Sequence, residues 1–223
     1  MTDRPAQPGN PTPAPGPTAP LLGGPVERGA SGGAPPDASA EPFPEVLGSR
    51  VVYEGRVVSL RVDEIALPHG RRATREVVEH PGAIVVIALD ERGEVALVRQ
   101  YRHAVKRYLL ELPAGGLEPG EEPLATAQRE LREEVGVEAA RWTPLGHFFS
   151  SPGFANEILH VFLAEDLRPA YAEPDEDEDI AVVRYSLSEL YEHPERIEDA
   201  KSLAALLLLS RLSNACSRPG LPP

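Results

Sequence analysis

Residues 114–137 read AGGLEPGEEPLATAQRELREEVGV. Pro123 suits the first turn of a helix, where its missing N–H is not needed, and Gly136 suits the left-handed residue just past a helix end. The segment between them therefore predicts about three turns of helix. Apolar residues recur there at intervals of three and four, so we expect one stripe facing the core, made by Leu124, Ala127, Leu131 and Val135.

The same helix carries Glu130, Glu133 and Glu134 on neighbouring faces, at spacings i, i+3 and i+4. Like charges at these spacings destabilise a helix by about 0.2–0.5 kcal/mol per pair. A divalent cation would turn this repulsion into binding, because Mg²⁺ takes oxygen ligands and keeps waters and substrate phosphates in its shell. The alternative is a solvated acidic helix face, which is the usual meaning of a bare glutamate cluster.

This segment resembles the Nudix box, Gly-x5-Glu-x7-Arg-Glu-U-x-Glu-Glu-x-Gly-U, in which U is apolar. Every fixed position is filled, by Gly115, Glu121, Arg129, Glu130, Leu131, Glu133, Glu134, Gly136 and Val137. The resemblance implies an α+β protein in which a mixed β-sheet is sandwiched between helices.

Motifs outside the box resemble the ADP-ribose pyrophosphatase branch of the Nudix family. They are Arg75–Val77, His80–Gly82, Val98–Arg102, Glu111–Gly115, Ser151–Phe154 and Asp199–Lys201. The implied reaction is hydrolysis of ADP-ribose to AMP and ribose 5-phosphate with Mg²⁺, for which Mn²⁺ can substitute. General chemistry agrees, because cleavage of a pyrophosphate needs cations at its oxygens and a positioned, deprotonated water.

The resemblance also assigns roles around the metal. It places metal ligands at the Ala114 carbonyl, Glu130 and Glu134, with Glu133 supporting them. Arg129 would orient a box carboxylate through charge-assisted hydrogen bonds. An exposed arginine that merely pairs with Glu133 four residues on is the alternative for Arg129.

The catalytic base is expected outside the box, on the acidic run at residues 173–179. By resemblance Glu176 matches the base, and Glu178 matches a second acid that helps to hold metal. Glu178 is also the second candidate for the base. A solvated acidic run is the alternative for any one of these residues.

Substrate contacts are expected in two groups. Arginine can fork onto phosphate oxygens, and the resemblance gives this group as Arg75, Glu76 and Arg102. The loop after the box and the turn that opens it supply the rest, at Gly116, Ser151, Pro152, Gly153 and Glu157. Surface salt bridges are the alternative for the two arginines. Arg56-Val57 stand where an aromatic that stacks on adenine is often found, and Tyr53 is a possible substitute.

Composition divides the chain further. Residues 1–45 hold 12 of the 25 prolines and few apolar residues, so we expect a disordered tail without a signal peptide. A small β subdomain at 46–80, a hydrolase domain at 81–213 and a flexible end at 214–223 would follow. No run is long enough to span a bilayer, and the one cysteine excludes an internal disulfide. These features predict a cytoplasmic protein.

The net charge of −13 argues against a nucleic-acid partner, whose backbone needs clustered Lys and Arg. Turn signals and short apolar runs predict strands at Val51–Tyr53, Val57–Val62, Glu64–Leu67, Thr74–Glu79, Ala83–Leu89, Val95–Gln100, Leu145–Phe149, Glu157–Leu163 and Ile180–Tyr185. A short helix opening at Ser186 and a second at Lys201–Ser213 should follow. The six histidines fit no metal spacing and are interpreted as ordinary strand or loop residues.

Two other functions compete with ADP-ribose hydrolysis. One is a pyrophosphatase for another nucleoside-diphosphate sugar, such as GDP-mannose, since the box recognises only metal and diphosphate. The other is a non-catalytic ADP-ribose sensor, against which the complete glutamate set counts. The branch usually forms homodimers whose amino-terminal strands help to build the partner's site, so we expect a homodimer by resemblance.

Overall fold

The computed structural model describes residues 44–67, 70–170 and 180–216. The strands are β1 (Glu45–Glu54), β2 (Ser59–Ala66), β3 (Arg72–Glu79), β4 (Ala83–Leu89), β5 (Glu94–Arg102), β6 (Arg107–Glu111), β7 (Ala114–Gly116), β8 (Val137–Phe149), β9 (Ile158–Pro169) and β10 (Ile180–Ser186). The helices are α1 (Pro123–Val135), α2 (Leu187–Glu192), the short 3₁₀ helix η3 (Pro194–Arg196) and α3 (Ala200–Cys216).

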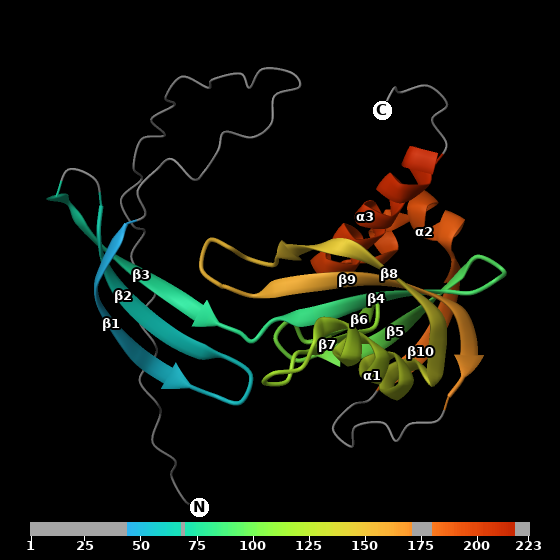
Figure 1. The fold of residues 1–223 in the computed structure, drawn as a ribbon, viewed down its shortest axis with the longest axis horizontal. Coiled ribbons are helices and arrows are strands. Elements are labelled where there is room, and N and C mark those ends of the chain that lie inside the picture. The colour runs from blue at the N-terminus through green and yellow to red at the C-terminus, as the bar shows by residue number, and fades with distance from the viewer. Residues whose placement is uncertain (1–43, 68–69, 171–179, 217–223) are drawn as a thin grey trace, which may run out of the picture. The chain divides into compact units, whose positions relative to one another are not determined.

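The larger sheet has seven strands, five of which run in the order β10-β5-β4-β9-β8. β4 and β9 are parallel, whereas every other pair in this sheet is antiparallel. β6 extends the sheet from β5, and β7 pairs with β4 beyond the β4–β5 contact. The sheet is therefore mixed, as the sequence predicts (Figure 1).

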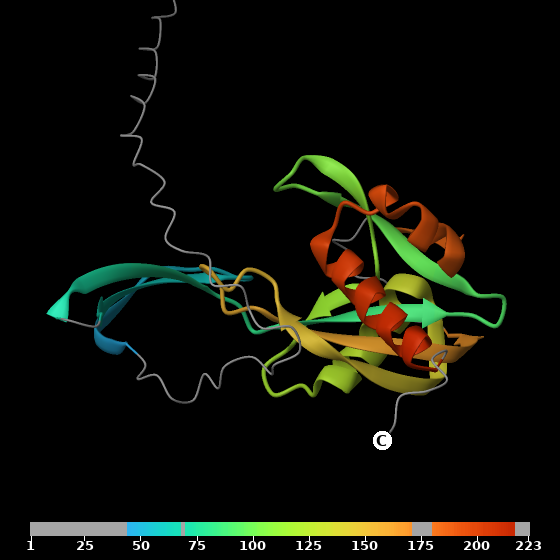
Figure 2. The same cartoon turned by 90° about the horizontal axis from the view of Figure 1, so that it is seen from above.

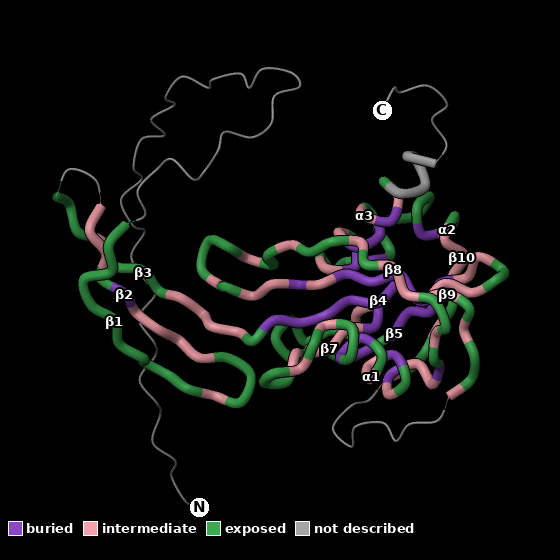
Figure 3. The backbone as a smooth tube through the Cα atoms, viewed as in Figure 1, coloured by how far each residue is buried: buried purple, intermediate pink, exposed green. Residues whose placement is uncertain are grey.

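β4 lies at the centre of the core because both of its faces are covered. Val85 and Ile87 pack with residues of α2 and α3, while Ile84 and Val86 pack with Ala127 and Leu131 of α1. All four of these β4 side chains are fully buried (Figure 3). Helices thus cover both faces of the sheet, with α3 on one of them (Figure 2), which confirms the predicted α+β class.

The first three strands form a separate antiparallel sheet in the order β1-β2-β3. Every residue of β1 is exposed. The end of β3 is tied to the loop that precedes β9, because Val78 N–H donates to the Phe154 carbonyl at 2.8 Å and Asn156 N–H donates to the Val78 carbonyl at 3.1 Å. This loop and the junction between β3 and β4 therefore lie side by side.

Helix α1 confirms the predicted bounds. It starts at Pro123 and is closed by Gly136 in the left-handed region, with φ of 72°. Ala127 and Leu131 are buried as expected. The prediction that Leu124 faces the core was wrong, because this residue is 40% exposed. It lies in the first turn, ahead of the part of the helix that packs on the sheet.

The strand predictions succeed where apolar runs are long. β4 has the predicted bounds, and β2 joins two predicted strands into one. β6, β7 and the first half of β8 were not predicted. Residues 138–141 (Glu-Ala-Ala-Arg) favour helix, but pairing with β9 makes this segment a strand, since strand formation depends on neighbours more than on local preference.

Two predictions lie outside the described residues, namely the disordered tail up to residue 43 and the acidic run at residues 173–179. α3 continues to Cys216, beyond the predicted end at Ser213. The proposed domain boundaries stay predictions. In the part of the chain that the structure describes, no helix is long and apolar enough to cross a membrane, and the cytoplasmic location also stays a prediction.

Candidate active site

The acidic helix is fastened to β7 through a buried carboxylate. Glu134 is 7% exposed, and its Oε2 accepts a hydrogen bond from the Ala114 N–H at 3.0 Å. Ala114 in turn pairs with Val85 of the central strand. The carboxylate is therefore held at a fixed place beside the backbone of β7.

Glu130 approaches the same strand even more closely. A Cβ built on Gly115 would lie 1.9 Å from Glu130 Oε1 and 2.0 Å from Glu130 Cδ. A Cβ cannot coexist with the carboxylate at such a distance, so any larger residue at Gly115 would force Glu130 to move. The box glycine and the box glutamate are a steric pair.

Arg129 links three carboxylates of the segment. Its Nη1 donates to Glu130 Oε1 at 2.8 Å and to Glu133 Oε2 at 2.9 Å, and its Nη2 donates to Glu121 Oε2 at 3.3 Å. Burial lowers the pKa of Arg129, but the three carboxylates outweigh burial and raise that pKa above its ordinary value. The hydrogen bond from Arg129 likewise lowers the pKa of Glu121.

Arg129 consequently contacts Glu133 four residues on, as the plain helix pairing requires, and also contacts Glu130. Its side chain is 27% exposed, so it is not a solvated surface arginine. By spreading one positive charge over several carboxylates it offsets the repulsion that their spacing creates. A role in orienting the carboxylates is compatible with this geometry.

The donor chemistry suits a hard divalent cation, because carboxylates and a backbone carbonyl are oxygen ligands. Glu130, Glu134 and the backbone of Ala114 meet where α1 packs against β7. Within residues 44–67, 70–170 and 180–216, no three His, Cys, Asp or Glu side chains form a ready-made metal cluster. Glu178, the further proposed ligand, lies outside the described residues.

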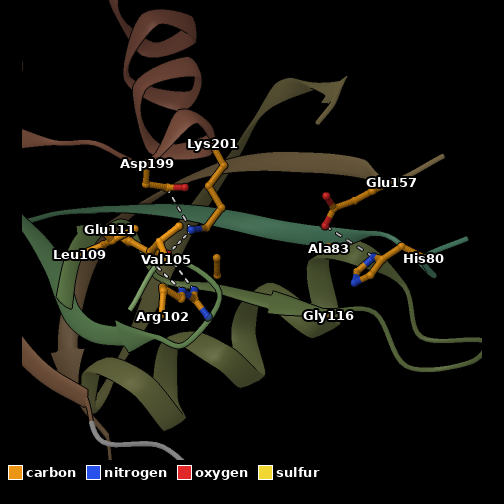
Figure 4. A pocket seen from close by; sticks show the side chains of 11 residues that line it. His80, Ala83, Arg102, Val105, Leu109, Glu111, Gly116, Glu157, Asp199 and Lys201 are labelled. Carbon is orange, nitrogen blue, oxygen red and sulfur yellow. Dashed lines mark hydrogen bonds and ion pairs between the residues drawn. The ribbon is translucent and has the colours of Figure 1, made fainter. Parts of the chain in front are cut away.

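A pocket of about 390 Å³ opens beside β7. Lys201, Glu111 and Arg102 point toward one another at one end, and His80 faces Glu157 at the other (Figure 4). Its lining residues are His80, Ala83, Arg102, Val105, Leu109, Glu111, Ala114, Gly116, Glu157, Asp199 and Lys201. The pocket thus offers two clusters of charged and polar groups separated by small residues of β4 and β7.

The structure brings some of the predicted substrate residues to this pocket. Arg102, Gly116 and Glu157 line it together with Ala114. Arg75 and Glu76 are exposed on β3 and do not line it. Ser151, Pro152 and Gly153 lie in the loop that is tied to β3, also outside the lining, and Glu176 lies outside the described residues.

Four titratable residues of the pocket had no predicted role, namely His80, Glu111, Asp199 and Lys201. All four lie in motifs that carry the family resemblance, and these motifs were the signal by which the sequence could have identified them. His80 was interpreted as an ordinary loop residue; in the structure it lines the pocket, and its Nδ1 lies 3.6 Å from Glu157 Oε1 and accepts the Gly82 N–H at 3.1 Å.

Comparisons with known proteins agree with this geometry. Residues 78–206 match the family model described as the NUDIX domain, and residues 45–78 match that of the nucleoside diphosphate sugar hydrolase N-terminal domain. The ADP-ribose pyrophosphatase of Bacillus subtilis (strain 168) is 41% identical, with 74% of this chain and 91% of that protein covered. The methanol dehydrogenase activator of Bacillus methanolicus gives the same identity and coverage. A solved structure described as an ADP compounds hydrolase is similar with a TM-score of 0.69 and 26% identity, covering 79% of this chain and 97% of that one.

Replacing Gly115 by Ala should displace Glu130, because the new Cβ would occupy the place of its carboxylate. We expect Mn²⁺ affinity to fall about tenfold or more, the loss typical when the support of a metal ligand is removed. Titration followed by the electron paramagnetic resonance signal of free Mn²⁺ measures it. Gly48→Ala is the control, since a Cβ there meets nothing within 4 Å. Equal affinities in the two variants would contradict a role for Glu130 in metal binding.

Proposed function

Because the chain belongs to the Nudix family of hydrolases, we propose that it hydrolyses the pyrophosphate bond of ADP-ribose, giving AMP and ribose 5-phosphate. The observation that carries the proposal is the position of β7. The box carboxylates rest on this strand, and the pocket with Arg102 and Lys201 opens beside it. A diphosphate needs these two environments next to each other, cation ligands and fixed positive side chains.

A divalent cation is the cofactor that such a hydrolase generally needs, and we propose Mg²⁺. The Ala114 carbonyl, Glu130 and Glu134 would hold it, with Glu133 and Glu178 in support. When bound, it would neutralise charge on the diphosphate oxygens and lower the pKa of a bound water.

The protein's own groups are proposed to do the rest of the chemistry. Arg102 binds an anionic oxygen of the substrate, and Glu157 accepts a hydrogen bond from the ribose side. Arg129 keeps Glu130 and Glu133 in place. Glu176 is the proposed base that takes the proton of the attacking water, with Glu178 as the second candidate.

The purified protein should cleave ADP-ribose in the presence of Mg²⁺ or Mn²⁺ and lose all turnover in a chelator. A panel of ADP-ribose, GDP-mannose, diadenosine polyphosphates and NADH, read out as released AMP or phosphate, measures the preference. If the protein cleaves GDP-mannose and leaves ADP-ribose intact, the proposed substrate is wrong, but the proposed pyrophosphate hydrolysis still holds. Binding of ADP-ribose without cleavage of any compound in the panel would instead identify the protein as a non-catalytic sensor.

Glu134→Gln should abolish both metal binding and turnover, because the amide keeps the shape of the side chain but removes the anionic ligand. Glu176→Gln should keep metal affinity and lower turnover by about two to four orders of magnitude, as loss of a general base does. Metal titration followed by kinetics at saturating Mg²⁺ separates the two roles. A normal Glu176→Gln enzyme beside an inactive Glu178→Gln enzyme would move the base to Glu178.

We further propose that the protein is a homodimer joined through β1. Large apolar side chains are exposed there, with Val46, Val51 and Tyr53 each more than half exposed, and Val57 follows in the turn after β1. Contiguous exposed apolar residues mark interaction surfaces. Arg75 and Glu76, which do not line the pocket of their own chain, would then serve the site of the partner.

Val51→Glu should convert the dimer to a monomer at micromolar concentration, because it places a charge among these apolar side chains. Light scattering coupled to size-exclusion chromatography measures the mass. Val182→Glu is the control, since Val182 is also an exposed valine, on β10 of the other sheet. A wild-type monomer, or a Val51→Glu dimer, would refute the proposed interface.

A further inference from the structure

Four charged side chains outside the Nudix box form one network at an end of the pocket. Glu111 accepts from Arg102 Nε at 2.8 Å and from Arg102 Nη2 at 2.7 Å, so the pair is bidentate. Lys201 also donates to Glu111, and it donates to Asp199 Oδ2 at 3.0 Å. The four residues come from β5, β6, the start of α3 and the residue before it.

Glu111 is the centre of this network and the most buried member. Its side chain is 2% exposed, whereas that of Lys201 is 16% exposed and that of Arg102 is 41% exposed. Burial raises the pKa of Glu111, but the bonds from Arg102 and Lys201 outweigh burial and hold the pKa below its ordinary value. The carboxylate is therefore ionised at neutral pH, and both cations contribute to keeping it so.

Such a network is a costly way to fill a core. Replacing a buried ion pair by apolar residues of similar volume is often neutral or stabilising, whereas removing one partner destabilises strongly. Stability alone therefore does not account for a carboxylate at this position with two cations around it. The edge of Arg102 that faces the pocket gives the network a functional explanation.

The bidentate pair leaves one edge of Arg102 for a ligand. Nε and Nη2 are engaged by Glu111, and Nη1 has no hydrogen bond to any part of the chain that the structure describes. Arg102 lines the pocket together with Ala114 and Gly116 of β7. A guanidinium fixed on one edge has lost its side-chain freedom before the ligand arrives, so binding costs less ordering.

The network also reaches the backbone that leads into the box. Asp199 Oδ2 accepts from Ser202 N–H at 3.0 Å and from Ser202 Oγ at 2.6 Å. Ser202 Oγ in turn accepts the buried Leu112 N–H at 2.8 Å. The start of α3 therefore fixes residues 111 and 112, three and two positions before Ala114.

We propose that Glu111 and Lys201 are positioning residues for substrate binding, which hold Arg102 with its outer edge toward a diphosphate oxygen in the pocket. This inference rests on the proposed function. Glu111 touches the substrate through Arg102 only, and Lys201 acts by holding Glu111. The start of α3 is thereby part of the substrate site although it lies far from the box in sequence.

A double-mutant cycle tests the inference with Glu111→Gln, Arg102→Ala and the double variant. Each single variant should raise KM for ADP-ribose by about tenfold to a hundredfold, the range for loss of a charged hydrogen bond, while kcat changes much less. The double variant should be no worse than Arg102→Ala, because Glu111 acts through that side chain. Independent, additive losses would overturn the proposal, and so would an unchanged KM in Glu111→Gln.

Glu198→Gln is the matched control, because Glu198 also receives a bidentate arginine, Arg107, at 2.6 and 2.7 Å but on an exposed surface outside this pocket. It should keep the wild-type KM. If Glu111→Gln does not fold, Lys201→Met takes its place in the cycle, where additive losses again overturn the proposal. The cycle is repeated by calorimetry with inorganic pyrophosphate, which reports the anion site without turnover. The protein could fail to cleave ADP-ribose while the variants lose pyrophosphate affinity non-additively. That result would support the positioning role of Glu111 and Lys201 and reject only the proposed function.

Discussion

The closest approach in the site is between α1 and β7, where Glu130 rests on Gly115 without room for a Cβ and Glu134 accepts the Ala114 N–H. β7 is held there by pairing with β4, whose two faces are both covered. The apolar side of α1 packs on one of these faces through Leu131. One short helix thus joins the core to the acidic site, so the position of the carboxylates depends on the packing below them.

The carboxylates of this helix repel one another, and a single cationic side chain offsets this repulsion. Arg129 reaches Glu121, Glu130 and Glu133 at once. A bound divalent ion would add positive charge to the same group, and the arginine allows the carboxylates to gather before it arrives. The second positive centre, Arg102 with Lys201, is tied to its own buried carboxylate. The two centres remain close to each other, because Glu134 helps to raise the pKa of Arg102.

Local signals in the sequence were enough for the helix, but not for the strands β7 and β8 on either side of it. Pro123 and Gly136 marked the ends of α1, and the spacing of the glutamates indicated which would approach one another. Pairing between distant segments was not predictable in this way. Lys201 and Glu111 are 90 residues apart, and no period connects them. The first half of β8 has helix-favouring residues and becomes a strand only because β9 is beside it.

Recognition of a nucleobase places a further demand on the molecule. No Phe, Tyr or Trp is among the described residues that line the pocket, whose ends are charged. Stacking on adenine, which needs an aromatic face, must then come from outside this lining. Tyr53 is 58% exposed on β1, amid the apolar side chains that are proposed to meet a second copy. In the proposed dimer, Tyr53 is a candidate for this aromatic, and base selectivity would then depend on the second copy.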